Sequence, residues 1–204
     1  MGLTRFALIL LLLFLTGPTR SFAQTRATTQ DGRPVILNTD GTWRYMDAPG
    51  AVTAERSVNA TAFVQGARVP YKVWYDPAKW EPIKRKGPGE AEHILTHSKR
   101  DAYALVIAER IQVPLDKLKD VALAHTRNAA PDARLVSAAE RVVNGARILN
   151  VQIDATVSGV PFTYYSYYYS GKQGTIQVVT YTSQNLFEEY NPDFIEFLAG
   201  LVIE

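Results

Sequence analysis

A run of tyrosines between residues 164 and 169 carries the side chains best suited to recognising a partner. The dipeptide Ser158-Gly159 before it predicts a two-residue turn, which sets the residues that lie opposite each other in the flanking strands. One face of this hairpin then combines polar and aromatic side chains: Asp154 pairs with Thr163, Gln152 with Tyr165 and Asn150 with Tyr167. Tyrosine supplies aromatic area and a hydroxyl to an interface. We therefore expect a shallow binding surface made of Tyr165, Tyr167, Tyr169, Gln152 and Asp154.

The opposite face of the same hairpin is apolar and is expected to face the core. Its predicted pairs are Val157 with Val160, Ala155 with Phe162, Ile153 with Tyr164 and Leu149 with Tyr168. A structural role for the tyrosines is the alternative, because aromatic residues are frequent in strands for packing reasons alone. In that case the tyrosines fill the core on one side and shield the sheet on the other.

Metal chemistry would need histidines at close spacing, and His93 and His97 are four residues apart. On a helix they would share a face, but the run around them predicts an extended strand. On a strand the two residues lie about 13 Å apart, which is too far for one ion. We expect solvent-facing histidines, no metal site even when His125 is included, and no cofactor.

The sequence contains few signs of catalytic chemistry. Glu109, Glu140 and Asp154 lie on predicted strands, and no spacing joins two of them as an acid and a base. The chain has no cysteine, and it has no nucleophile-elbow, zinc-protease, phosphate-loop or dinucleotide motif. The basic run Lys84-Arg85-Lys86 could attract an anionic partner, but a solvated loop explains it as well. These residues do not indicate an enzyme.

The first 23 residues have the pattern of a secretory signal peptide. A positive charge at Arg5 precedes the apolar run of residues 6–15, and small residues stand at Ser21 and Ala23, where signal peptidase would recognise them. The run is about half as long as a membrane-spanning helix. We predict cleavage after Ala23, a periplasmic or secreted location, and no membrane insertion of the mature chain.

Removal of the signal peptide leaves a net charge near zero. The sequence has 22 Lys and Arg against 20 Asp and Glu. The signal peptide contains Arg5 and Arg20 but no acidic residue, so the mature chain is balanced. Nonspecific binding to nucleic acid depends on many basic contacts with phosphate. We therefore expect no nucleic-acid partner.

A short β-hairpin and a linker are predicted between the signal peptide and the main domain. Residues 24–46 contain Asp31-Gly32 and Asp40-Gly41, dipeptides that favour tight hairpin turns. This segment resembles a short motif ending in DGTW that recurs near the start of many exported bacterial proteins, a resemblance that implies no activity. Residues 47–60 are rich in small and polar residues and predict a linker. The main α+β domain then spans residues 61–204.

The first half of the main domain predicts a hairpin and a helix. Residues 91–97 and 102–111 form the hairpin, and the run 104–108 is apolar throughout. That run predicts a central strand covered on both sides. An amphipathic helix is predicted over residues 114–128.

The second half of the main domain predicts a meander and a terminal helix. Turns at Asn144-Gly145, Ser158-Gly159 and residues 171–174 separate four sequential antiparallel strands. Asn191 is the predicted N-cap of the helix, and Pro192 is its predicted first residue. The helix is expected to pack on the sheet.

Three segments carry a wider resemblance: YKVWYDPAKW at 71–80, YALVIAERI at 103–111 and TSQNLFEEYNPDFIEFLAGL at 182–201. With the order of the predicted elements, they make residues 63–203 similar to the Mog1/PsbP-like families. The resemblance implies an α+β fold with an antiparallel sheet between packed helices. Known relatives are mainly non-catalytic assembly, accessory or binding proteins, and no active-site motif carries over.

The expected function is therefore that of an exported, non-catalytic accessory or binding module with a protein partner in the cell envelope or a small ligand. One alternative is a carrier that holds a small apolar ligand between the sheet and the terminal helix. Phe187, Tyr190, Phe194 and Phe197 would line its cavity. The second alternative is a hydrolase whose residues meet only in the folded chain.

Overall fold

The computed structural model describes residues 25–28, 34–37, 43–45, 53–83 and 91–204. The chain divides into two units, residues 1–46 and 47–204, and each is considered by itself. The predicted signal peptide, both Asp-Gly turns and the basic run of residues 84–86 lie outside the described residues.

The first unit contains a three-stranded antiparallel sheet. Its strands are β1 (Thr25–Thr28), β2 (Pro34–Leu37) and β3 (Trp43–Tyr45). Val35 of β2 pairs with Ala27 of β1 on one side and with Tyr45 of β3 on the other. β2 is therefore the central strand of this sheet.

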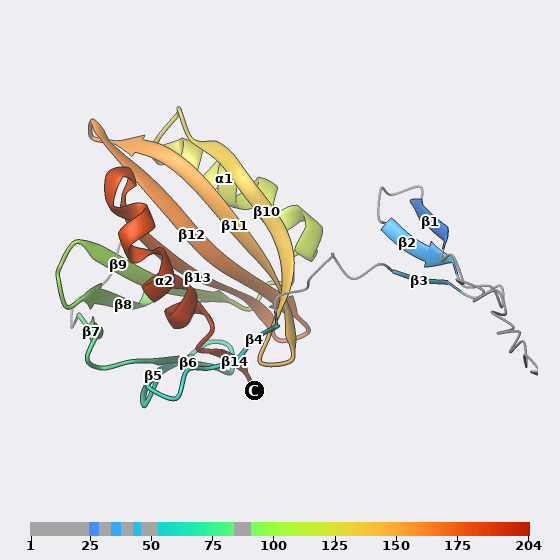
Figure 1. The fold of residues 1–204 in the computed structure, drawn as a ribbon, viewed down its shortest axis with the longest axis horizontal. Coiled ribbons are helices and arrows are strands. Elements are labelled where there is room, and N and C mark those ends of the chain that lie inside the picture. Colours follow the sequence, from blue (N-terminus) through green and yellow to red (C-terminus); the bar gives the residue numbers. More distant parts are fainter. Residues whose placement is uncertain (1–24, 29–33, 38–42, 46–52, 84–90) are drawn as a thin grey trace, which may run out of the picture. The chain divides into compact units, whose positions relative to one another are not determined.

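The second unit is built on an eight-stranded sheet (Figure 1). From one edge to the other its strands are β4 (Thr53–Ala54), β10 (Arg134–Val143), β11 (Ala146–Val157), β12 (Val160–Gly171), β13 (Gly174–Ser183), β9 (Ala102–Glu109), β8 (Ala91–His97) and β7 (Trp80–Pro82). Neighbouring strands are antiparallel, except that β4 runs parallel to β10. The prediction of four sequential antiparallel strands is confirmed by β10 to β13.

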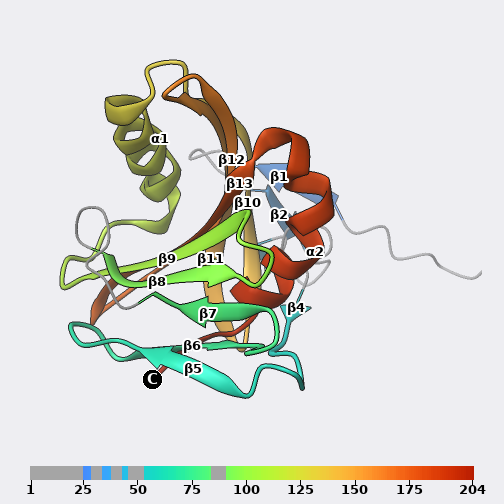
Figure 2. The ribbon, with the colours of Figure 1, turned by 90° about the vertical axis from the view of Figure 1, so that its left-hand side faces the viewer.

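Two helices cover opposite faces of the large sheet (Figure 2). α1 (Leu118–Ala129) follows the 3-10 turn η1 (Leu115–Lys117) and packs on β10 and β11. α2 (Phe187–Leu198) follows the 3-10 turn η2 (Gln184–Leu186) and packs on β12 and β13. The expected antiparallel sheet between helices is therefore confirmed. No helix in the described part of the chain is long and apolar enough to cross a membrane.

A smaller antiparallel sheet packs against α2. Its strands, in spatial order, are β14 (Leu201–Ile203), β6 (Tyr71–Tyr75) and β5 (Ala62–Gln65). Val73 of β6 pairs with Leu201 on one side and with Val64 on the other. Because β14 follows α2 directly, this sheet joins the end of the chain to the beginning of the second unit.

Two tight turns set the register of the long strands. The φ angles are 45° and 80° at Asn144-Gly145, and 51° and 82° at Ser158-Gly159. Positive values at both central residues are those of a type I′ hairpin turn, whose twist matches the flanking strands. The second turn places Val157 opposite Val160 and aligns β11 with β12 in the predicted register.

The two faces of the large sheet bury separate cores. Side chains alternate between the faces along each strand, so β11 and β12 supply both cores. The core beneath α2 includes Tyr71, Val73, Trp80, Val106, Ile148, Tyr165, Tyr167, Ile176, Val178, Phe194 and Phe197. The core beneath α1 consists of Leu118, Ala122, Ala130, Ala133, Leu149, Val151, Ile153, Ala155 and Tyr168.

The terminal helix begins earlier than its capping signals predict. Asn191 and Pro192, the predicted N-cap and first residue, lie inside α2, which starts at Phe187. Proline inside a helix removes a backbone hydrogen bond. Phe187 and Tyr190 are buried against the sheet, and the gain from burying two aromatic side chains outweighs that loss.

Candidate functional site

The predicted tyrosine surface is not accessible. Tyr165 and Tyr167 pair with Gln152 and Asn150 as predicted, but they are only 8% and 1% exposed. α2 lies over this face, and the ring of Phe187 stands 5.9 Å from that of Tyr165. The expectation of an exposed surface at these two tyrosines is therefore wrong, because both belong to the core beneath α2.

The other three predicted site residues are Tyr169, Gln152 and Asp154, and they are also half-buried or buried. Tyr169 is half-buried against the core beneath α2, and Gln152 is also half-buried. Asp154 is buried, and its carboxylate accepts hydrogen bonds from three side chains, those of Arg134, Thr163 and Gln184. These donors satisfy the carboxylate and join β10, β12 and η2 to β11.

A small polar pocket lies beside Asp154. Its volume is about 80 Å³, well below the several hundred Å³ of a typical small-molecule site. Its lining residues are Asp132, Arg134, Asp154, Ala155, Thr156, Pro161 and Gln184. The carboxylate of Asp132 already accepts a hydrogen bond from the backbone N–H of Thr156 at 3.0 Å. The size of the pocket excludes an organic ligand of ordinary dimensions.

The two histidines of β8 have different environments. Nε2 of His93 lies 2.7 Å from the carbonyl oxygen of Gln65, and the residue is half-buried. His97 is 3% exposed and makes edge contacts with the rings of Trp80 and Tyr190, at centroid distances of 5.2 and 5.0 Å. The expectation of two solvent-facing histidines is therefore wrong for His97. Among the described residues, no group of three His, Asp or Glu side chains could hold a metal ion.

The buried His97 of β8 lies beside Asp193 of α2, whose side chain is partly exposed. Nε2 of His97 lies 3.2 Å from Oδ2 of Asp193 but lacks hydrogen-bond geometry. Nδ1 accepts a hydrogen bond from the backbone N–H of Lys99 at 3.3 Å. Burial lowers the pKa of His97, although Asp193 favours the protonated form. Because the ring is closed to solvent and Nδ1 is occupied, the hydrolase alternative gains no support from this pair.

Acid is expected to weaken the fold through His97. The folded chain lowers the pKa of His97, so the unfolded chain binds the proton more readily and stability falls as the pH drops through about 6.5. Lys79 and Lys99 add to this effect, and Asp193 opposes it. The melting temperature should fall between about pH 7.5 and pH 5.5, and His97→Gln should reduce the fall.

Thermal unfolding followed by circular dichroism at the two pH values measures this effect. The window lies above the range in which Asp and Glu titrate, so their protonation contributes little. If the melting temperatures of His97→Gln and of the unmodified chain fell by the same amount between the two pH values, another group would cause the acid sensitivity.

The aromatic side chains of α2 fill the space between the helix and the sheet. The ring centroids lie 4.7 Å apart for Trp80 and Phe197, 6.2 Å for Tyr190 and Phe194, and 6.3 Å for Phe187 and Phe194. These are the distances of packed aromatic pairs. The residues that would line the cavity of a carrier therefore form a packed core, which does not favour that alternative.

A second set of aromatic residues lies on the α1 side of the sheet. Tyr103 of β9 pairs with Tyr181 of β13, and Tyr181 pairs with Tyr164 of β12. The ring centroids of these pairs are 5.4 and 5.6 Å apart, and the ring of Phe162 lies 6.1 Å from that of Tyr181. All four residues are half-buried. We call Tyr103, Phe162, Tyr164 and Tyr181 the aromatic row.

The aromatic row is open because α1 covers only part of its side of the sheet. α1 packs on β10 and β11, and the core beneath it reaches β12 at Tyr168, with Tyr164 packed against its margin. Farther across the sheet, Leu105 of β9 and Val179 of β13 are half-buried. The expectation that residues 104–108 are covered on both sides is therefore wrong for the α1 side.

The sheet around the aromatic row carries almost no charge. On this face of β8, β9, β12 and β13, the neighbours of the row include Ile94, Thr96, Leu105, Ile107, Gln177, Val179 and Ser183. Among the described residues of that face, Glu109 at the end of β9 and Glu81 of β7, which pairs with Thr96, are charged. Strands of a sheet that meets water on one side normally place polar and charged side chains on that side. The described part of this face therefore carries less charge than a solvated sheet face normally does.

Comparisons with known proteins bear on the fold. No sequence-family model matches the chain, and no curated protein sequence matches it. The solution structure of cyanobacterial PsbP (CyanoP) from Synechocystis matches 72% of this chain and 95% of that chain, with a TM-score of 0.57 and 12% sequence identity. The chain has a Mog1/PsbP-like fold.

Two other solved structures match this chain with lower TM-scores. The Ran-binding protein Mog1p of Saccharomyces cerevisiae has a TM-score of 0.48 and 9% identity, over 70% of this chain and 94% of that chain. A protein of unknown function from Pseudomonas aeruginosa, described as a putative regulator, has a TM-score of 0.45 and 10% identity, over 70% and 96%. Identities this low bear on the fold alone.

The aromatic row stands on regular strands, which hold its side chains in place. The hydroxyl of Tyr103 donates to the carbonyl oxygen of Arg100 at 3.1 Å, and burial raises the pKa of Tyr164. The sequence signal for the row was the alternation of large and small residues at 102–108. The pairing of Tyr103 with Tyr181 depends on contact between β9 and β13, which are about 80 residues apart in the sequence. No local pattern predicts such a contact.

Proposed function

We propose that this protein is an exported, non-catalytic accessory protein of the cell envelope that binds a protein partner through the aromatic row. The observation that carries the proposal is an uncharged row of half-buried aromatic residues on an open sheet face. Interface centres are enriched in tyrosine and phenylalanine and depleted of charged residues. Export is supported by the signal-peptide pattern of residues 1–23.

The aromatic row has a geometry suited to a protein partner. Tyr103, Tyr181 and Tyr164 stand directly opposite one another on three adjacent strands, so their rings form one continuous surface. A partner that completes their burial gains apolar contact from each ring, and their hydroxyls can still reach water or polar groups at the rim. The sheet holds the rings in place beforehand, so little conformational entropy is lost on binding.

A double substitution in the row tests the proposal. The tagged full chain would be expressed in its native host, and the exported fraction would be cross-linked and analysed by mass spectrometry. Tyr164→Ser with Tyr181→Ser should reduce recovery of a stoichiometric partner at least about tenfold, as expected when two aromatic anchors are lost. Circular dichroism would establish that the variant is folded.

Ile195→Ser is the matched control, because Ile195 is a large apolar residue exposed on α2, at the other side of the sheet. It should leave recovery of the partner unchanged. Equal recovery with the folded double variant would contradict a role for the aromatic row. Turnover of a substrate that a single non-destabilising substitution abolishes would contradict the non-catalytic assignment.

A further inference from the structure

α2 leaves two strands of the large sheet uncovered on its own side. It packs on β12 and β13, and β10 and β11 extend beyond it (Figure 1). Val143 and Ile148 of these strands belong to the core beneath α2, so alternation places every second residue from them on the same face. That face carries a set of polar or small side chains, which we call the polar strip: Ser137, Ala139 and Arg141 of β10, and Asn150 and Gln152 of β11.

The guanidinium of Arg141 is held in place by a buried amide. Its Nε donates a hydrogen bond to Oδ1 of Asn150 at 3.0 Å, and Nδ2 of Asn150 donates to the carbonyl oxygen of Ser166 at 3.1 Å. Asn150 is 4% exposed, so it fixes the guanidinium against the sheet. The charge of Arg141 also opposes the rise that burial causes in the pKa of Tyr167. The guanidinium therefore points over β11 toward β12 and not out from the edge of the sheet.

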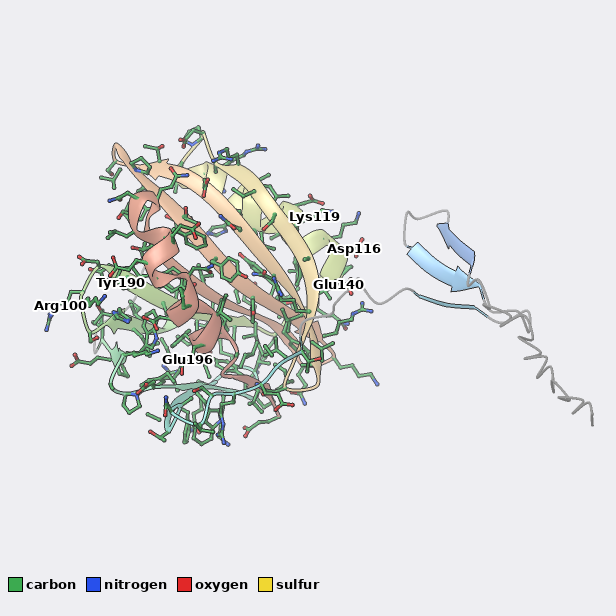
Figure 3. All side chains as sticks on the ribbon, in the orientation of Figure 1. Arg100, Asp116, Lys119, Glu140, Tyr190 and Glu196 are labelled. Carbon is green, nitrogen blue, oxygen red and sulfur yellow. The ribbon has the colours of Figure 1, made fainter. Side chains whose placement is uncertain are left out.

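Among the described residues, no carboxylate forms an ion pair with Arg141. Glu140 is its neighbour on β10 (Figure 3), but Glu140 projects to the other face and lies 3.5 Å from Nε of Arg147. Asp154, farther along β11, already accepts a hydrogen bond from Arg134. A guanidinium has five N–H donors, and Asn150 takes one of them. Arg141 therefore keeps its positive charge and most of its donors for another acceptor.

The neighbours of Arg141 leave room for a small group beside the guanidinium. Ala139 stands between Ser137 and Arg141 on the same face and carries only a methyl group. Ser137 lies opposite Gln152, about 7 Å along the strands from Ala139 and Asn150. Within the described part of the chain, the side chains of Ser137 and Gln152 make no hydrogen bond. A group that lies over Ala139 is therefore flanked by one cation and two neutral polar side chains.

We propose that the polar strip binds the carboxylate of a small, polar organic acid. The carboxylate lies over Ala139 and accepts two hydrogen bonds from Arg141, whose planar fork matches the two carboxylate oxygens. Ser137 and Gln152 meet a hydroxyl or carbonyl group of the same acid. The single cation of the strip favours a carboxylate, which has one negative charge, over a phosphate group with nearly two. This site is on the α2 side of the sheet and is separate from the aromatic row.

Lactate serves as the probe, because it combines a carboxylate with a neighbouring hydroxyl group, and lactamide is its neutral control. Nuclear magnetic resonance of the purified mature chain follows the Nε–H of Arg141 and the side-chain amides of Asn150 and Gln152. Millimolar lactate should shift these signals until the site is saturated, and lactamide should leave them unchanged. No shift with lactate, an equal shift with lactamide, or tighter binding of methyl phosphate than of lactate would overturn the proposal.

Arg141→Gln should weaken lactate binding at least about tenfold, because it removes the charge and the paired hydrogen bonds. Arg147→Gln is the matched control. It removes the same charge from the neighbouring strand, but Arg147 lies opposite Val142 and points to the other face of the sheet. It should leave lactate binding unchanged. Equal weakening by the two substitutions would mean that only the net charge of the chain attracts the probe, which contradicts a site at the polar strip.

Ala139→Leu tests the position of the carboxylate without removing a charge. Ala139 is exposed, so the larger side chain should leave the fold intact and fill the space beside Arg141. Lactate binding should fall at least about tenfold, since the guanidinium can no longer form both hydrogen bonds. Unchanged binding by the folded variant would contradict the proposed position. A response to lactate that appears only in Asp47→Asn, outside the described residues, would also overturn the proposal, because a carboxylate of the chain itself would then fill the site.

Discussion

Tyr167→Ala is expected to lower the free energy of unfolding by about 4 kcal/mol, as large aromatic truncations in a core do. Tyr167 is 1% exposed, its ring lies 6.4 Å from that of Tyr165, and burial raises its pKa to about 12. Removal of the ring leaves a cavity beneath α2 that the long strands cannot close. Guanidinium unfolding followed by circular dichroism measures the loss.

Tyr164→Ala is the control for this experiment, because Tyr164 lies on the same strand but on the opposite, half-open face. Its loss should cost about 2 kcal/mol, less than that of Tyr167, since Tyr164 is only partly buried. The contrast separates a core tyrosine from a surface tyrosine in one strand. If Tyr167→Ala kept its stability and lost the envelope partner, binding would involve the face beneath α2 and the aromatic row would not be the site.

Gly200→Ala is expected to cost about 3 kcal/mol, because the added Cβ would overpack a site that has no room for it. That Cβ would lie 1.8 Å from the carbonyl oxygen of Trp74 and 3.0 Å from that of Phe197. Both contacts are with backbone atoms, which cannot rotate away. The carbonyl oxygen of Gly200 also accepts a hydrogen bond from the N–H of Trp74 at 2.9 Å, so relief of the clash pulls β14 from β6.

Gly145→Ala tests whether the loss of stability in Gly200→Ala comes from the close backbone contacts or from the replacement of glycine itself. Gly145 has a φ of 80°, and an added Cβ would meet no atom within 4 Å. The only cost is the left-handed backbone conformation, about 1 kcal/mol. Urea unfolding of both variants gives the comparison. Equal losses would indicate that the backbone around Gly200 relaxes and that its close contacts do not determine the stability of β14.

Local chemistry accounts for the parts of the fold that could be predicted. Asn144-Gly145 and Ser158-Gly159 adopt the positive φ angles that these dipeptides favour, and the strand pairing follows from the turns by counting. Gln152 therefore stands opposite Tyr165, as predicted. Such pairing needs information only from residues close in the sequence, which is why it was accessible without a structure.

Burial of the candidate site could not be predicted in the same way. The alternating pattern of β12 shows that it has two faces, but both faces carry tyrosine, and the pattern does not say which face a distant helix covers. α2 buries Tyr165 and Tyr167 on one face, and α1 leaves Tyr164 half-open on the other. His97 was misjudged for the same reason, because Trp80 and Tyr190 bury it from other elements.

By itself, the sequence determined the α+β class, the four-stranded meander with its register, and the presence of two amphipathic helices, because these follow from turn dipeptides and side-chain periodicity over short distances. The tertiary structure alone decided that Tyr165 and Tyr167 are core and that Tyr103 and Tyr181 meet in an open aromatic row. Those properties depend on which elements meet across the fold. Such contacts are set by packing between residues far apart in the chain, where no local preference applies.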